Sequence, residues 1–293
     1  MVIAVLDQKG ADHGQGTPPQ LITKHSLFEK IGERFHLLLV EDYPTNQKVA
    51  TSYLTNAGYH VDVAGNGKEG VEACRSKQYD LILMDIQMPE MDGYQATAAI
   101  RHLEQEDDGN LARTRTRSPI IALTAHATEE DKQKCLEAGM DDFLTKPLQR
   151  GDLLQTIAKW LAPKGVPPAR PQECRAASPG KEAPAVDFDK AIKEFDGQRD
   201  LVFSIVREFS DDIKQQIETM NVALAGSDAE TIRKEAHSIK GGAANVHAQE
   251  LSQNAKEIEE LAKAGELEAI PQALASLSEA NERVRNALQE AAG

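Results

Sequence analysis

Four charged side chains and one threonine stand at the ends of short apolar runs in the first half of the sequence. The run Leu81–Met84, for example, has four bulky apolar residues in a row and is followed by Asp85. Such uninterrupted runs are typical of strands buried in a parallel sheet, whose carboxyl ends meet at one edge. We therefore expect five side chains to lie close together at that edge. They are Glu41, Asp42, Asp85, Thr124 and Lys146.

A cluster of this composition suits phosphoryl transfer. Crowded carboxylates stay ionised when a cation lies among them, and ligands that are all oxygen suit Mg²⁺ better than a softer metal. Asp85 is then the candidate nucleophile toward phosphorus. The metal and Lys146 would neutralise the charge on the transferring oxygens, and the Thr124 hydroxyl would donate a hydrogen bond to one of them.

The chain around these residues alternates strand and helix patterns from His36 onward. Strands are expected at residues 37–40, 59–63, 81–85, 119–124 and 142–144. Helices are expected between them at residues 44–57, 68–76, 93–104 and 129–138. Asp152 is expected to cap a last amphipathic helix that ends near Leu161. This order predicts a doubly wound α/β fold with a five-stranded parallel sheet.

Residues 36–161 resemble the flavodoxin-like receiver domain of response regulators. The motifs that carry the likeness are, in chain order, Val40-Glu41-Asp42, Met84-Asp85-Ile86-Gln87-Met88-Pro89, Leu123-Thr124-Ala125 and Phe143-Leu144-Thr145-Lys146-Pro147. The resemblance implies that Asp85 accepts a phosphoryl group. It implies a Mg²⁺ site made by Asp42, Asp85 and the backbone carbonyl of Gln87, with Glu41 acting mostly through water. It also implies that Thr124 and Phe143 switch on phosphorylation, while Gln87 and His126 tune the lifetime of the phosphoryl group.

The alternation of strand and helix patterns ends after residue 161. Residues 162–185 contain six prolines and no periodic apolar pattern, which predicts an interdomain linker. Helical patterns follow, a short one at residues 188–195 and four longer ones as far as residue 290. A capping box, Ser227-Asp228-Ala229-Glu230, is expected to open the second of the four. Residues 186–290 are therefore expected to form an all-α domain, an antiparallel four-helix bundle with one additional packing helix.

One histidine in this helical half stands out by its neighbours. His237 lies one position off a stripe that is expected to be buried, so we expect its imidazole to reach the surface. The stripe consists of Ile232, Ala236, Ile239, Ala243 and Val246. Arg233, Lys234 and Lys240 share its face and would hold a phosphoryl group, while Gly241 lets a partner approach closely. A neutral imidazole is a competent nucleophile, so His237 is a candidate phosphoryl acceptor.

The stretch from Ala236 to Asn245 resembles the signature of histidine-containing phosphotransfer domains. The likeness implies that His237 is phosphorylated and that Lys240 and Gly241 shape its site. The family usually has glycine at the position of His247. A receiver followed by such a domain predicts a phosphorelay protein, in which phosphoryl groups pass between Asp85 and His237 and to or from partners. A sensor histidine kinase and other receiver or phosphotransfer domains are the partners expected.

Two alternatives stay open. In the first alternative to the relay protein, the chain is a C-terminal piece of a hybrid sensor histidine kinase, whose ATP-binding part would lie upstream. In the second, it is a signalling scaffold that binds partners without phosphotransfer. No ATP-binding kinase domain is expected within the chain itself, and the direction of phosphoryl flow stays open.

The composition bears on whether the protein binds nucleic acid and on the cellular compartment in which it is expected. The formal charge of −14 argues against a nucleic-acid-binding surface, because duplex affinity depends largely on Lys and Arg. Three cysteines without a metal-binding spacing are typical of the cytoplasm, and no membrane segment is expected. Residues 1–35 are expected to be a flexible lead-in, and residues 105–118 a solvated loop.

Overall fold

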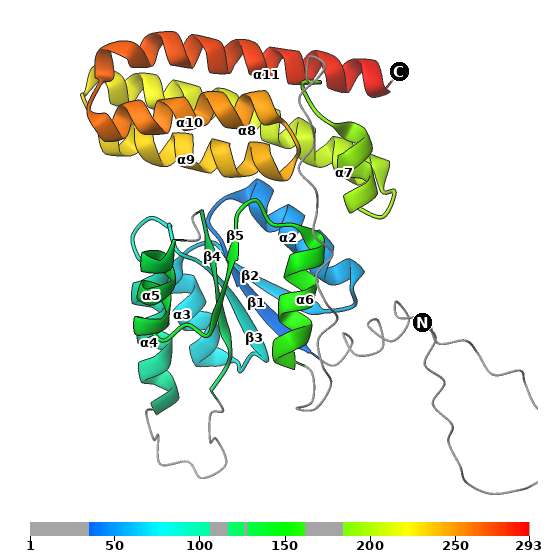
Figure 1. Cartoon of the computed structure of the whole chain (residues 1–293), viewed down its shortest axis with the longest axis vertical. Coiled ribbons are helices and arrows are strands. Elements are labelled where there is room, and N and C mark those ends of the chain that lie inside the picture. The colour runs from blue at the N-terminus through cyan, green and yellow to red at the C-terminus, as the bar shows by residue number, and fades with distance from the viewer. Residues whose placement is uncertain (1–34, 106–116, 126–127, 162–183, 293) are drawn as a thin grey trace, which may run out of the picture.

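A computed structural model describes residues 35–105, 117–125, 128–161 and 184–292 of the chain (Figure 1). The predicted lead-in, most of the predicted linker, most of the 105–118 loop and His126 lie outside these residues.

The first described unit is built on a parallel sheet of five strands in the order β2-β1-β3-β4-β5. The strands are β1 His36–Val40, β2 His60–Ala64, β3 Leu81–Asp85, β4 Ile120–Thr124 and β5 Asp142–Thr145. Every residue of β3 and β4 is buried, as their uninterrupted apolar runs predict. The registers pair Val40 with Met84 and Asp85 with Leu123, so the carboxyl ends of the central strands lie level.

Helices cover both faces of this sheet (Figure 1). They are α2 Pro44–Asn56, α3 Gly67–Ser76, α4 Gly93–Gln105, α5 Glu129–Glu137 and α6 Arg150–Leu161. Helices α2 and α6 lie on one face, and α3, α4 and α5 lie on the other. The predicted α/β doubly wound fold is confirmed.

The second described unit is helical throughout. Its elements are α7 Phe188–Glu194, α8 Arg199–Ala225, α9 Ala229–Asn245, α10 Gln249–Ala264, the short 3-10 helix η1 Leu267–Ala269 and α11 Ile270–Ala292. The four long helices lie side by side and enclose apolar residues such as Phe209, Ile239 and Ile258 (Figure 1). Helix α7 packs at one end of this bundle, beside the receiver-like unit.

Two helix starts differ from the sequence prediction. Helix α6 begins at Arg150, so Asp152 lies within its first turn and is not its cap. Helix α9 is capped by Asp228, whose side chain accepts a hydrogen bond from the backbone N–H of Thr231. The preceding Ser227 has a φ of 55°, a left-handed backbone conformation, and cannot serve as the extended cap residue. Both errors come from turn geometry that the residue types alone do not specify.

The helical bundle lies above the carboxyl edge of the sheet and packs against it (Figure 1). A single cluster of buried apolar side chains runs from the α2 and α6 face of the sheet into the bundle. A second cluster, between the sheet and helices α3 to α5, has its members in the sheet-containing unit among the residues described. None of the described helices combines the length and the apolar character needed to cross a bilayer.

Candidate functional site

Three carboxylates gather at the carboxyl edge of the sheet. Glu41 and Asp42 directly follow β1, and Asp85 is the last residue of β3, so the parallel pairing of these strands brings the three together. One carboxylate oxygen from each lies within 4.8 Å of the others. Glu41 and Asp85 are buried, with 1% and 3% of their surfaces exposed. The arrangement is the one that the apolar runs predict.

Lys146 is the cation that faces these acids. Its Nζ lies 2.7 Å from Asp85 Oδ2 and 2.7 Å from Glu41 Oε2. Burial alone would lower the pKa of Lys146, but the charges of Asp85 and Glu41 outweigh burial and raise it. Lys146 therefore stays protonated and holds the two buried carboxylates in place.

One lysine does not balance three carboxylates. Burial, followed by the charge of Glu41, raises the pKa of Asp42 from 3.8 to about 6. The same two causes raise the pKa of Asp85, against the opposing effect of Lys146. A divalent cation would relieve this crowding, and the all-oxygen donor set suits Mg²⁺. The residues of this site therefore fit the predicted metal.

The remaining residues predicted on the receiver half lie around this cluster. Gln87 is exposed, and its N–H donates to Asp85 Oδ1 at 3.3 Å. Thr124 is buried at the end of β4, where its carbonyl accepts from the N–H of Lys146 at 2.7 Å. Phe143 is half-buried against the second apolar cluster, and Lys132 Nζ lies 5.2 Å from its ring centroid.

Gly93 is a residue of this site that the sequence analysis passed over. A Cβ at this position would lie 2.2 Å from the carbonyl oxygen of Asp85, closer than any side chain permits. The absence of a side chain lets α4 begin directly beside the loop that follows β3. The pair Asp92-Gly93 signals a turn, but its contact with Asp85 depends on the tertiary fold.

His237 lies on α9 and is more enclosed than the sequence predicts. Its side chain is 15% exposed, and its Nδ1 lies 2.7 Å from Glu259 Oε1 on α10. Burial would raise the pKa of Glu259, but hydrogen bonds from His237 and Lys240 lower it to about 2. Because the ionised carboxylate only accepts hydrogen bonds, Nδ1 donates in this contact, which leaves Nε2 as the ring nitrogen that can act as the nucleophile.

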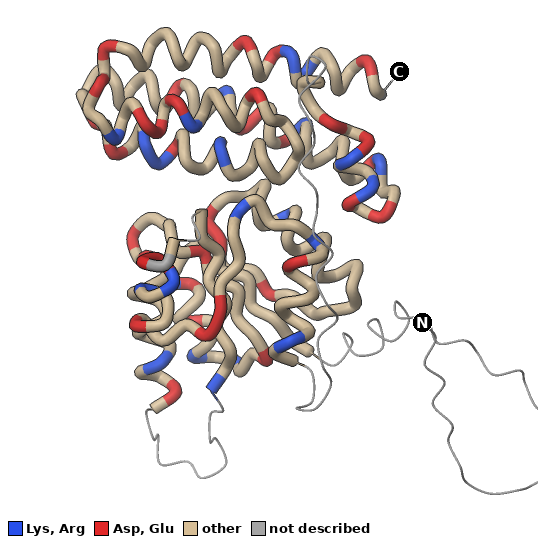
Figure 2. The backbone as a smooth tube through the Cα atoms, viewed as in Figure 1, with Lys and Arg blue, Asp and Glu red and all other residues tan. Residues whose placement is uncertain are grey.

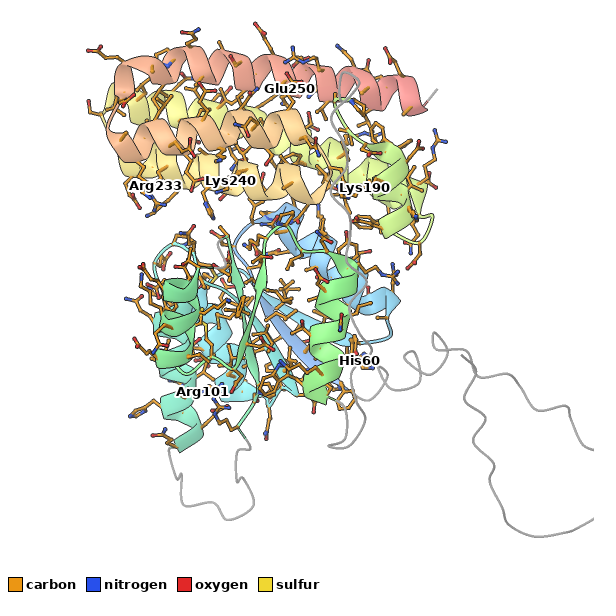
Figure 3. The ribbon with its side chains drawn as sticks, in the orientation of Figure 1. His60, Arg101, Lys190, Arg233, Lys240 and Glu250 are labelled. Atoms are coloured by element: carbon orange, nitrogen blue, oxygen red, sulfur yellow. The ribbon has the colours of Figure 1, made fainter. Side chains whose placement is uncertain are left out.

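The cations predicted around His237 are each paired with an acid. Arg233 donates to both oxygens of Glu230 at 2.9 and 2.8 Å, and Lys234 lies 3.7 Å from the same carboxylate. Lys240 donates to Glu259 at 2.6 Å. Arg233 and Lys240 project from the lower face of the bundle toward the sheet (Figure 3). Figure 2 shows basic positions on α9 above acidic positions at the sheet edge.

A chain of side-chain contacts links the helix of His237 to the cluster of Asp85. Gly241, one turn after His237, lies against Asn46, and a Cβ there would be 3.6 Å from Asn46 Nδ2. Asn46 Nδ2 donates to Glu41 Oε1 at 2.8 Å, and its Oδ1 accepts from Asn245 Nδ2 at 2.8 Å. The two candidate sites therefore share one boundary between the units.

Three residues of these contacts were not predicted from the sequence, namely Glu259, Asn46 and Asn245. Glu259 lies 22 positions after His237 on the next helix, and Asn46 and Asn245 are 199 positions apart. A charged residue at a half-buried position of an amphipathic helix was the available signal for Glu259. No local signal marks the two asparagines.

Two family models match the chain. The response regulator receiver domain matches residues 37–158, and the Hpt domain matches residues 204–291. The hybrid signal transduction histidine kinase B of Dictyostelium discoideum is 49% identical over 128 residues, which are 43% of this chain and 6% of that protein. The sensor histidine kinase GacS of Pseudomonas protegens is 34% identical over 207 residues, which are 70% of this chain and 22% of that protein. The chain thus spans less than a quarter of the length of these curated relatives.

Solved structures give a further comparison. The receiver domain of sensor histidine kinase PA1611 from Pseudomonas aeruginosa, described with a magnesium ion in its active site cleft, is 40% identical. The match covers 44% of this chain and 98% of that one, with a TM-score of 0.38. The predicted resemblance to both families is confirmed by the two family models. Residues 37–158 are thus a response regulator receiver domain, and residues 204–291 are an Hpt domain that follows it.

Proposed function

We propose that this chain relays phosphoryl groups between Asp85 of the receiver domain and His237 of the Hpt domain. One observation carries the proposal: the helix that bears His237 packs against Asn46, which hydrogen-bonds Glu41 beside Asp85. A nucleophilic carboxylate and an imidazole thus face a common boundary. Reversible phosphoryl transfer between an oxygen and a nitrogen nucleophile accounts for both.

Each residue of the two sites has a role in this reaction. In transfer toward His237, the Nε2 lone pair attacks phosphorus, the bond from phosphorus to the Asp85 oxygen breaks, and its electron pair returns to the carboxylate. Glu259 holds the ring with Nε2 available. Lys146, already 2.7 Å from Asp85 Oδ2, neutralises charge on the transferring oxygens. The proposed switch residues are Thr124 and Phe143. The residues proposed to tune the lifetime of the phosphoryl group are Gln87 and His126.

The proposed Mg²⁺ ligands are Asp42, Asp85 and the backbone carbonyl of Gln87, and Glu41 is proposed to act through water. When bound, the cation would supply a further positive charge to the phosphoryl oxygens. Arg233, Lys234 and Lys240 would hold those oxygens at the Hpt domain after exchanging their carboxylate partners. These assignments follow from the donor types and from the excess of negative charge in the receiver pocket.

A histidine kinase is the proposed phosphoryl donor, because the similar proteins are named histidine kinases. Other receiver or Hpt domains are the proposed further partners. The scarcity of cysteine supports a cytoplasmic location.

The test uses radiolabelled acetyl phosphate and Mg²⁺ on the full chain. Aspartyl phosphate is labile in alkali, whereas phosphohistidine is stable in alkali and labile in acid, so the two labels are distinguished directly. We expect both kinds of label on the wild type, alkali-labile label alone on His237→Gln, and no label on Asp85→Asn. Labelling of a chain in which both residues are replaced contradicts the proposal.

A further inference from the structure

Helix α7 and the turn after it, residues 188–197, contact the receiver domain at a place separate from the two reactive residues. Neither family match includes this segment, since one ends at residue 158 and the other begins at residue 204. Its main contact is Tyr53, two turns beyond Asn46 on receiver helix α2. The Tyr53 side chain is fully buried, its ring centroid lies 5.0 Å from that of Phe195, and its hydroxyl donates to Glu194 Oε2 at 3.1 Å.

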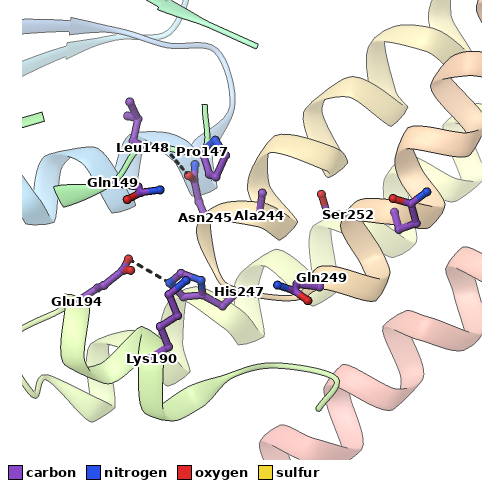
Figure 4. A pocket seen from close by; sticks show the side chains of 11 residues that line it. Pro147, Leu148, Gln149, Lys190, Glu194, Ala244, Asn245, His247, Gln249 and Ser252 are labelled. Carbon is purple, nitrogen blue, oxygen red and sulfur yellow. Dashed lines mark hydrogen bonds and ion pairs between the residues drawn. The ribbon is translucent and has the colours of Figure 1, made fainter. Parts of the chain in front are cut away.

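Glu194 also connects this contact to the helix pair of the Hpt domain. His247 Nε2 lies 3.0 Å from Glu194 Oε2, and His247 occupies the turn between α9 and α10 (Figure 4). Arg150, the first residue of α6, adds an ion pair to Asp196 at 2.7 Å. The segment therefore contacts two receiver helices and the turn that follows the helix of His237.

Asn245 makes a second contact between the domains, nearer the reactive residues. Its Oδ1 accepts from the N–H of Leu148, in the loop between β5 and α6, at 3.0 Å, while its Nδ2 donates to Asn46. Asn245 and Glu194 both line a pocket of about 450 Å³ that lies between the domains (Figure 4). Two contacts on either side of a pocket restrict rotation of one domain against the other more than a single contact would.

We propose that residues 188–197 are an intrachain docking element, which holds the receiver domain against the Hpt domain of the same chain so that Asp85 and His237 exchange the phosphoryl group within one molecule. This proposal rests on the proposed function and names the partner of each site. If the domains separated, Tyr53 and Phe195 would both become exposed to water. Domains joined in one chain meet at an effective concentration of about 1 mM, far above the micromolar concentration of a second molecule.

The test follows the rate of label transfer from Asp85 to His237 as the concentration of the full chain changes. Chains labelled with acetyl phosphate are separated from the reagent, and alkali-stable label is then measured over time. We expect a rate that stays constant over about a 100-fold range of protein concentration, because transfer within one chain is first order. A mixture of phosphorylated His237→Gln with Asp85→Asn, which can react only between molecules, is expected to transfer at least about 100-fold more slowly at micromolar concentration.

Charge reversal tests the docking element itself. Arg150→Asp places a carboxylate opposite Asp196, while an aspartate in the first turn of α6 remains compatible with the helix. We expect the intramolecular rate to fall by about tenfold or more, and the double variant Arg150→Asp/Asp196→Arg to recover most of it. The receiver of Arg150→Asp must still accept label from acetyl phosphate at the wild-type rate, which reports that it is folded.

The outcomes separate the two proposals. Alkali-stable label that appears at a rate proportional to protein concentration overturns docking within one chain and leaves the relay between Asp85 and His237 intact. A constant rate that Arg150→Asp does not change overturns the role of residues 188–197. Absence of alkali-stable label at every concentration, with Asp85 labelled, overturns the relay itself.

Discussion

The metal-free protein should become more stable at neutral pH when Asp42 is replaced by Asn. The pKa of Asp42 is raised from 3.8 to about 6, first by burial and then by the charge of Glu41. The folded state therefore binds the proton more tightly than the unfolded state, and the contribution of this group to stability falls as pH rises from about 4 to about 6. Above pH 6 the ionised carboxylate costs the folded protein about 3 kcal/mol, since one pKa unit corresponds to about 1.4 kcal/mol.

Asp42→Asn removes this cost and keeps the size of the side chain. We expect an increase in the free energy of unfolding of about 1–3 kcal/mol near pH 7.5 in the presence of a chelator, and almost no increase near pH 4. Urea unfolding measures it, because the single tryptophan of the chain, Trp160, lies on α6 and reports on the receiver domain. Glu257→Gln, which neutralises an exposed carboxylate of α10, is the control and should change stability by less than about 0.5 kcal/mol.

Addition of Mg²⁺ provides the second half of this test. A cation bound to the folded state alone adds about 2.7 kcal/mol of stability when its concentration is 100 times its Kd. We expect this gain in the wild type at neutral pH, a smaller gain as pH falls below about 6, and little gain in Asp42→Asn. A variant that is less stable than the wild type in chelator, or that gains as much from Mg²⁺, would refute the reasoning from charge crowding.

Four further substitutions test individual positions. Gly242→Ala should destabilise the chain by about 1–3 kcal/mol in urea unfolding, because a Cβ would lie 2.6 Å from Tyr43 Cε1 and 2.7 Å from Phe209 Cε2. Gly151→Ala in α6, where a Cβ meets no atom within 4 Å, should instead stabilise it by about 0.5–1 kcal/mol, and equal effects of the two would contradict this. Asn245→Ala should cost about 1–3 kcal/mol by the same measurement, since the buried N–H of Leu148 loses its acceptor. Glu259→Gln should slow phosphorylation of His237 by about tenfold, measured as alkali-stable label, because a neutral amide no longer fixes the proton on Nδ1; an unchanged rate would count against the positioning role.

The receiver half was largely predictable because its chemistry lies at the ends of strands. An apolar run fixes both the burial of β3 and the position of Asp85, and parallel pairing then places Asp85 beside Asp42 without further information. The same logic accounts for Lys146, which follows β5. The roles assigned to Thr124, Phe143 and Gln87 came from the family resemblance and remain predictions.

In the Hpt half, the helices were predictable from the sequence, but the surroundings of His237 were less so. The heptad-like spacing of Ile232, Ala236, Ile239 and Ala243 correctly indicated a buried stripe. His237 reaches the surface with only 15% of its side chain exposed, because a carboxylate from another helix covers one side of its ring. Periodicity within one helix reports which face is buried, but it does not report which polar groups a neighbouring helix presents to the other faces.

The two apolar clusters make the two faces of the receiver sheet different, because one face packs into the Hpt bundle and the other does not among the residues described. Side chains on the α2 and α6 face join those of the Hpt bundle, whereas the cluster that includes Ile100 and Met140, and against which Phe143 packs, belongs to the receiver among the residues described. Amide hydrogen exchange should therefore be slowest in α2 and β1 and faster in α4 and α5, as separate cooperative units. We therefore expect a conformational change on phosphorylation to occur on the α4 and α5 face of the receiver. Helices on this face can open locally while the receiver and Hpt domains stay in contact through the α2 and α6 face.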